Sequence, residues 1–264
     1  MPKALSLLIR SLNPSDVHLI TVPSLDFILP TGIHISPSFT SLISELSPKK
    51  YRRSYHIFKL LDDINFIPYP KKMTDFELAL NLSLTIWTEI GQTLLTFYLR
   101  TIEALKIDYT VLPLVNTPPH VYIETSNGSM DPLSFLRLRK PPEVKDIKIN
   151  NLQTAIVDDT KKALSESDKI LLYHLNPVSF VILQSIGSLK KIIENFKGLI
   201  LYALPSKISP AEGAILKKLG YLKNIHGLID FTHEQIDAII FDEKRTSVIE
   251  STSIYNLTLL PTSY

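Results

Sequence analysis

Two apolar segments of this chain end in small polar or acidic residues. Lys169–Tyr173 leads to Asn176 and Pro177, and Ile236–Phe241 leads to Asp242. Such segments are typical of buried parallel strands that open at their carboxyl ends into a ligand crevice. The amide of Asn176 could hydrogen-bond a phosphate or a ring edge there, although an Asn before a Pro also simply starts a turn.

Two histidines fall in the same predicted crevice. His34 lies just before a helix whose start is marked by Ser36 as N-cap and Pro37 in the first turn, and His174 ends the strand before Asn176. A histidine without a demonstrated partner is more often a structural residue than an acid or a ligand, so both readings stay open.

Paired carboxylates are the candidate metal ligands, because divalent cations such as Mg²⁺ prefer oxygen donors. Asp75 and Glu77 form one such pair, but Thr74 and Glu77 also have the spacing of a helix capping box. Asp237 and Asp242 are an odd number of positions apart, so in a strand their side chains fall on opposite faces and a shared metal is not expected. We therefore assign no metal ligand from the residues alone.

Apolar strands alternate with amphipathic helices along the chain, which predicts a parallel sheet covered by helices on both faces. The predicted strands are 17–21, 109–112, 169–173, 198–204 and 236–241. Capping boxes begin helices at Thr74 and Ser209, a helical region over 75–105 is interrupted at Gly91, and residues 126–128 form a hairpin turn. The predicted fold is α/β: a Rossmann-like three-layer fold with a mostly parallel sheet, in one domain over 1–264, with a helical insertion over about 50–105.

Composition excludes several classes of function. A formal charge of +2 and a pI near 8.5 are too small a bias to predict nucleic acid as the main partner, and the absence of cysteine removes disulfides and thiolate chemistry. The apolar runs are too short to span a membrane and no signal-like start is evident, so we expect no membrane partner and a cytoplasmic location. The chain has no nucleophile elbow, Walker loop, zincin motif or dinucleotide fingerprint, and its 8 glycines are few for a phosphate-cradling enzyme.

Four motifs, in the same order along the chain, resemble those of the 2-phospho-L-lactate transferases, which build the deazaflavin coenzyme F-420. Residues 32–37 are similar to the family's G-L-H-I-S-P, residues 113–118 with 123–125 to its P-M-(S/T)-D-D-P followed by an I-E-T strand, and residues 176–177 to the end of G-P-S-N-P. The strand that ends at Asp242 is similar to the family's strand ending in Asp-Glu.

The resemblance implies a reaction and a set of site residues. In this reaction a phospholactyl group is transferred from a guanylylated lactyl donor to the deazaflavin Fo, and GMP is released. The donor is guanylylated phospholactate, and the implied cofactor is magnesium. The implied catalytic residues are Asp75 and Asn116, and the implied substrate-binding residues are His34, Ser36, Asn176, Pro177 and Asp242. A homodimer is a further expectation.

Three positions depart from the family pattern. Where the family has Asp, this chain has Ser38, Thr40 and Asn116. The alternative hypothesis is therefore an eroded homologue that binds a ligand or an active partner without catalysis, and a third is a purely structural interaction protein.

The family also opens with a strand and a glycine loop, whereas this sequence starts at Met1-Pro2-Lys3. A first strand of such a sheet is normally central, so its loss would leave two inner edges unpaired. We expect either that the natural protein begins upstream of Met1, or that Val17–Thr21 closes directly onto Lys169–Tyr173 and narrows the crevice.

Overall fold

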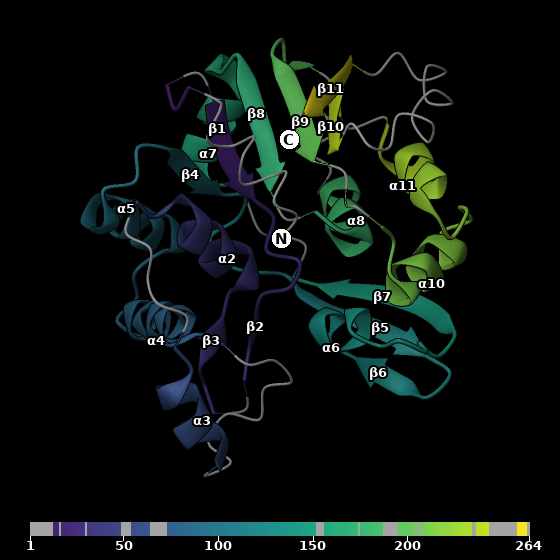
Figure 1. Ribbon diagram of the computed structural model, residues 1–264, viewed down its shortest axis with the longest axis horizontal. Helices are drawn as coiled ribbons and strands as arrows, with labels where there is room; N and C mark the ends of the chain where they lie inside the picture. Colours follow the sequence, from purple (N-terminus) through teal and green to yellow (C-terminus); the bar gives the residue numbers. More distant parts are fainter. Residues whose placement is uncertain are drawn as a thin grey trace.

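A six-stranded parallel sheet forms the centre of the molecule (Figure 1). The computed structural model describes residues 13–15, 17–29, 31–48, 54–63, 73–151, 156–173, 175–186, 195–203, 205, 207–233, 236–242 and 258–262. In spatial order the strands are β11 (Thr258–Thr262), β10 (Ala238–Asp242), β9 (Leu199–Ala203), β8 (Lys169–Tyr173), β1 (Val17–Thr21) and β4 (Thr110–Pro113). The predicted α/β class and the mostly parallel sheet are confirmed.

The strand pairing agrees with one branch of the expectation about the start of the sheet. β1 lies directly against β8, in parallel, with Leu19 opposite Leu171, and its other edge pairs with β4. The pairing of Val17–Thr21 with Lys169–Tyr173 is thus confirmed. The predicted strands at 109–112, 198–204 and 236–241 are present with boundaries shifted by one or two residues.

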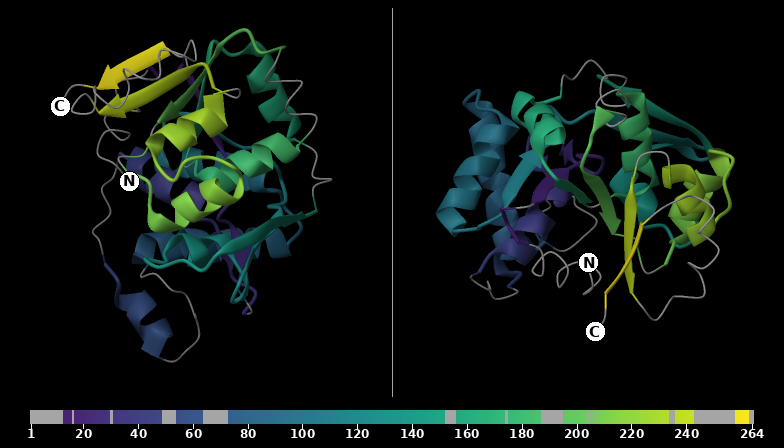
Figure 2. Two further views of the ribbon diagram at one scale, coloured as in Figure 1. Left: turned by 90° about the vertical axis from the view of Figure 1, so that its right-hand side faces the viewer. Right: turned by 90° about the horizontal axis from the view of Figure 1, so that it is seen from above.

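Helices cover both faces of the sheet, because alternate strand residues point to opposite sides (Figures 1 and 2). The helices are α2 (Pro37–Leu46), α3 (His56–Asp63), α4 (Asp75–Glu89), α5 (Leu94–Leu105), α6 (Pro132–Leu136), α7 (Asp158–Glu166), α8 (Pro177–Ser185), α10 (Pro210–Lys218) and α11 (Ile225–Thr232). Val17 and Leu19 pack with α2, α4 and α5, whereas Ile20 packs with α8, α10 and α11. These two apolar cores and the sheet between them are the three layers.

The predicted helical region is confirmed as two helices. α4 and α5 are separated at Gly91, which has a φ of +79°, a left-handed value that favours glycine. The capping box at Thr74 is also present: Thr74 Oγ1 accepts from the Glu77 N–H, and the Thr74 N–H donates to Glu77 Oε2. Ser209 caps α10 in the same way with Glu212.

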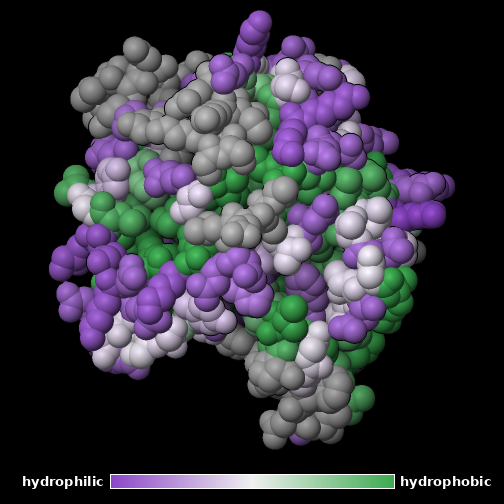
Figure 3. Space-filling model, turned by 180° about the vertical axis from the view of Figure 1, so that it is seen from behind, coloured by the Kyte–Doolittle hydropathy of each residue, from purple (hydrophilic) through white to green (hydrophobic). Residues whose placement is uncertain are grey.

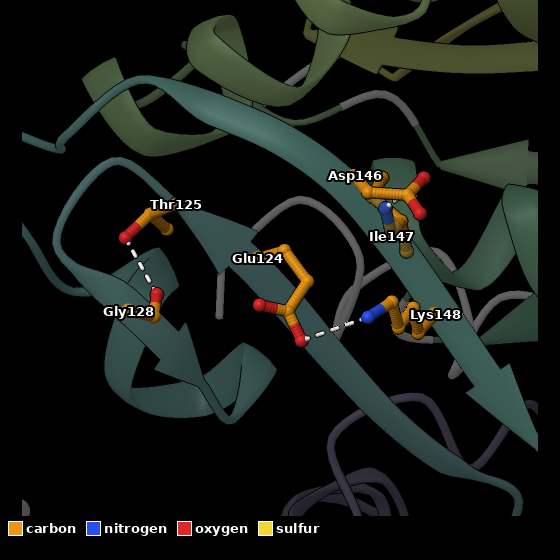
Figure 4. A network of polar contacts seen from close by, with 6 residues as sticks. All are labelled: Glu124, Thr125, Gly128, Asp146, Ile147 and Lys148. Carbon is orange, nitrogen blue, oxygen red and sulfur yellow. Dashed lines mark hydrogen bonds and ion pairs between the residues drawn. The ribbon is translucent and has the colours of Figure 1, made fainter.

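Two small antiparallel sheets complete the fold. β2 (Phe27–Ile28) pairs with β3 (His34–Ile35), and β5 (His120–Thr125) lies between β6 (Gly128–Met130) and β7 (Val144–Asn150). The predicted hairpin turn joins β5 to β6, where Thr125 Oγ1 donates to the Gly128 carbonyl at 2.7 Å (Figure 4). Lys148 Nζ lies 3.5 Å from Glu124 Oε1 across the neighbouring strands.

The surface mixes polar and apolar side chains. On the face opposite to the view of Figure 1, hydrophobic residues gather across the middle of the molecule (Figure 3). Large side chains such as Leu60, Ile86 and Ile90 are more than half exposed. Within the residues that the structure describes, no helix combines the length and the apolar character that crossing a bilayer requires.

Candidate functional site

A cleft of about 780 Å³ opens beside the carboxyl ends of β1 and β4. Its walls come from five parts of the chain: the segment 24–29 after β1, His34 in β3, the end of α4 with the turn to α5, the segment 116–122 after β4, and the start of α6. The polar side chains among its lining residues are Ser24, Asp26, His34, Thr88, Glu89, Gln92, Asn116, Thr117, His120, Tyr122, Asp131 and Ser134. The cleft therefore lies where a parallel α/β sheet normally binds its ligand.

Asp26 is the buried carboxylate of this cleft, with only 7% of its surface exposed. Its Oδ2 accepts from Ser36 Oγ at 2.6 Å, and its Oδ1 accepts from Ser38 Oγ at 2.7 Å. Burial raises the pKa of Asp26 to about 6, although the two serine hydroxyls favour the ionised form and pull the other way. Asp26 thus changes its protonation state close to neutral pH.

The predicted positions of Ser36 as N-cap of α2 and of Pro37 in its first turn are confirmed, but the hydroxyl of Ser36 has another partner. Ser36 occupies the N-cap position, but its hydroxyl bonds to Asp26 and makes no cap hydrogen bond. Its backbone N–H donates to Asn81 Oδ1 at 2.8 Å. The buried carboxylate competes successfully for the hydroxyl because a hydrogen bond to a charged acceptor is stronger than one to a neutral partner.

Aromatic side chains fix the environment of Asp26 from the α2–α5 side. Tyr98 Oη lies 3.2 Å from Thr21 Oγ1 at the end of β1, and its ring stacks on Phe39 with centroids 3.7 Å apart. Burial, together with the nearby charge of Asp26, raises the pKa of Tyr98 well above its usual range, so its hydroxyl stays neutral. Tyr98 is therefore a hydrogen-bonding group and not an acid at physiological pH.

Asn176 begins α8 and is buried, with Pro177 as the first residue of the helix. Its Oδ1 accepts from the backbone N–H groups of Val178 and Ser179 at 2.9 and 3.2 Å. Its Nδ2 donates to Ser24 Oγ at 3.1 Å, and Ser24 lines the cleft. The side chain of Asn176 thus holds the start of α8, as the structural alternative for this residue expects. Its link to the cleft is its hydrogen bond to Ser24.

The two predicted residues that line the cleft directly are His34 and Asn116. His34 is buried, which lowers its pKa and favours the neutral ring, and its backbone N–H donates to Thr85 Oγ1 at 2.8 Å. Asn116 is exposed, and its Oδ1 accepts from the Leu95 N–H at 3.4 Å. Both can present polar atoms to a ligand.

Asp75 does not belong to the described lining of the cleft. Asp75 accepts from the Ser54 hydroxyl and, at 3.0 Å, from the Ile57 N–H at the start of α3. The Ser54 hydrogen bond is the main cause that lowers the pKa of Asp75. Asp242 ends β10, and β9 and β8 lie between it and β1, so about 14 Å of sheet separates its backbone from the cleft strand. His174 and Glu243 lie outside the described residues.

The described donors do not fit a magnesium ion held by protein side chains. Among them, no three His, Cys, Asp or Glu residues lie close enough together to form a metal site. The Asp26 oxygens already accept serine hydroxyls, and Ser38 stands where the resemblance implied an acidic residue. We therefore derive no step through a metal.

Sequence reasoning did not identify Asp26 or Ser24. The available signal was their position a few residues after the central strand, where the chain leaves the sheet toward the ligand edge. That signal is weak, because the burial of Asp26 and its hydrogen bonds to the serines after β3 arise only from tertiary packing. The arrangement supplies one carboxylate able to exchange a proton near neutral pH, beside a cleft of small-molecule size.

The curated proteins with similar sequences are 2-phospho-L-lactate transferases. No family model matches the chain. A 2-phospho-L-lactate transferase from Methanosarcina barkeri is 21% identical over 251 residues, which cover 89% of this chain and 80% of that protein. A second, from Methanosarcina acetivorans, is 22% identical over 143 residues, which cover 52% of this chain and 47% of that protein.

Solved structures agree on the fold. Two crystal structures of a UPF0052 family protein from Bacillus halodurans superpose with a TM-score of 0.61 at 12% identity. They cover 98% and 99% of this chain and 89% of the other. At this identity the likeness establishes the fold alone.

Proposed function

Because this chain is a divergent relative of the 2-phospho-L-lactate transferases, we propose that it transfers a phospholactyl group from a guanylylated lactyl donor to the deazaflavin Fo. The cleft beside β1 and β4 is the proposed site. Its volume of about 780 Å³ is in the range of small-molecule sites, and its walls come from segments far apart in the sequence. Such a site promotes transfer mainly by holding two substrates in reactive orientation.

The observation that carries this proposal is the protonation chemistry of Asp26. In the transfer, an acceptor hydroxyl oxygen forms a bond to the donor phosphorus, the bond to GMP breaks, and the hydroxyl proton must leave. A carboxylate with a pKa of about 6 is largely ionised at neutral pH and is basic enough to take that proton. Ser36 and Ser38 position the carboxylate through their hydroxyls, and the Ser38 backbone also hydrogen-bonds to it.

A second candidate function is ligand binding without catalysis. It is favoured by the neutral residues Ser38 and Asn116 at family acidic positions, and by Asn176, whose amide caps α8. In this case the cleft would still bind one of the two substrates, but Asp26 would serve only to order the segment after β1. The two candidates make different predictions for turnover.

Turnover separates the candidates directly. The purified chain is incubated with the guanylylated donor and Fo, and released GMP is measured by chromatography. We expect GMP release that Asp26→Asn reduces by about 10²-fold or more, since removing a general base has effects of this order. Asp158→Asn is the matched control, because Asp158 is an exposed carboxylate on α7 that pairs with Lys161.

Calorimetry with donor, Fo and GTP completes the design. Saturable binding without GMP release would favour the second candidate. Equal turnover in wild type and Asp26→Asn would show that Asp26 takes no part in the chemistry. If the chain showed no binding and no turnover, the proposed function would be refuted.

A further inference from the structure

A second groove, of about 970 Å³, lies away from the cleft. It is lined by the start of β7, by α10 with the residues just before it, and by Lys223 in the segment after α10. Thr125 pairs with Val144 and His120 pairs with Asn150, so the groove lies at one end of the small sheet and the cleft at the other. The proposed transfer reaction does not use this groove.

The groove is strongly cationic. Its charged lining residues are Lys145, Lys217, Lys218, Lys223 and one acid, Glu143. Within the described part of the chain, none of these lysines forms an ion pair, and the ion pairs found there use Arg100, Lys148, Lys161 and Lys162. Lys148, on the same strand as Lys145, instead pairs with Glu124 (Figure 4). An anionic partner would relieve the repulsion among these charges.

Helix electrostatics explain only half of the cluster. Lys217 and Lys218 lie in the last turn of α10, where cations interact favourably with the helix dipole. Lys145 and Lys223 come from other segments. A Cβ at Gly213 would lie 3.2 Å from Lys223 Cβ, so the absence of a side chain lets the Lys223 segment approach α10 closely. The fold thus brings the lysines together.

The uncharged lining residues indicate the kind of anion. Val144, Ile208, Ala214 and three prolines supply apolar contacts, and among the described residues no aromatic side chain or arginine lines this groove. Single-stranded nucleic acid is normally held by aromatic stacking, and arginine is over-represented where phosphate is recognised by two parallel hydrogen bonds. We propose that this groove binds an acidic peptide segment of a partner protein, with apolar side chains in the groove and carboxylates on the lysines.

The edge of β7 makes sheet extension a poor mode for this partner. The Ile147 N–H donates to its neighbour Asp146 Oδ1 at 2.9 Å (Figure 4), and lysines flank this position along the strand. Both features protect an edge strand from pairing with another chain. The peptide is therefore expected to bind through its side chains.

Fluorescence anisotropy tests the proposal with the full chain and a labelled peptide of alternating glutamate and leucine. We expect saturable binding that weakens with added salt, and about tenfold or greater weakening in the double variant Lys145→Glu, Lys223→Glu. Lys145→Gln with Lys223→Gln should give an intermediate loss and keeps the test usable if charge reversal impairs folding. The matched control is Lys59→Glu with Arg100→Glu, on α3 and α5, which should change affinity by less than about twofold.

Three results would overturn the inference. These are no binding of the peptide, equal weakening in the groove and control variants, and tighter binding of a labelled oligothymidylate than of the peptide at equal salt. The test does not depend on the transfer reaction, because the groove variants leave the cleft residues unchanged.

Discussion

Replacing Asp26 with Asn should make the protein more stable at neutral pH and change how stability depends on pH. The folded state holds the pKa of Asp26 at about 6, against an ordinary value of 3.8. At about 1.4 kcal/mol for each pKa unit, this difference corresponds to about 3 kcal/mol. The cost arises because ionised Asp26 is buried and its two serine hydrogen bonds do not fully replace water.

The sign follows from proton binding. Between about pH 4 and pH 6 the folded state keeps a proton on Asp26 that the unfolded state has released, so rising pH lowers the free energy of unfolding across this window. Asn cannot ionise. The stability of Asp26→Asn relative to wild type should therefore rise from near zero at pH 4 to as much as about 3 kcal/mol above pH 6.

Urea unfolding at a series of pH values measures this difference. The fluorescence of Trp87, the one tryptophan of the chain, reports on the α4–α5 pair, where its Nε1 donates to Thr96 Oγ1 at 3.0 Å. Other titrating groups cancel in the comparison of variant with wild type. The reasoning would be refuted if the difference in free energy of unfolding between variant and wild type did not change with pH. It would also be refuted if wild type became more stable relative to the variant as pH rises.

Three further predictions concern other parts of the fold. Asp75→Asn should change stability with the opposite sign. Because hydrogen bonding lowers the pKa of Asp75, the ionised side chain stabilises the folded state at neutral pH, and this stabilisation disappears as pH falls through the folded pKa. Chemical unfolding should therefore show a variant less stable than wild type at pH 7 and equally stable in acid. Asn176→Ala should lower the free energy of unfolding by about 1–2 kcal/mol, since it removes the α8 cap and a partner of Ser24, and unchanged stability would contradict the cap. Gly227→Ala should destabilise severely in thermal unfolding, because a Cβ there would lie 2.0 Å from the Leu222 carbonyl oxygen, and a melting temperature close to wild type would contradict this close contact.

The sequence alone predicted the elements that depend on local pattern. Val17–Thr21 and Lys169–Tyr173 were placed correctly because each is a short, mostly apolar segment between polar ones, which is typical of a buried strand. The capping box at Thr74 and the break at Gly91 were likewise local, since they require only side-chain spacing and a left-handed φ.

The candidate site was predicted only in part, because its members meet through tertiary contacts. Asn176 was placed at the end of the right strand, but its hydrogen bonds to the α8 backbone and to Ser24 follow from how the chain turns after the strand. The place of the strand that ends at Asp242 could not be predicted, because a sequence does not give strand order, and β8 and β9 separate this strand from β1.

Asp26 shows most clearly what only the tertiary structure decided. In the sequence it is an ordinary acid after a strand, and nothing local distinguishes it from exposed carboxylates such as Asp158. Its pKa depends on exclusion of water by the surrounding elements and on hydroxyls from Ser36 and Ser38, ten and twelve positions away. Desolvation is a property of the whole packed environment, and therefore the chain determined its strands and caps locally while the chemistry of its cleft arose only from the assembled fold.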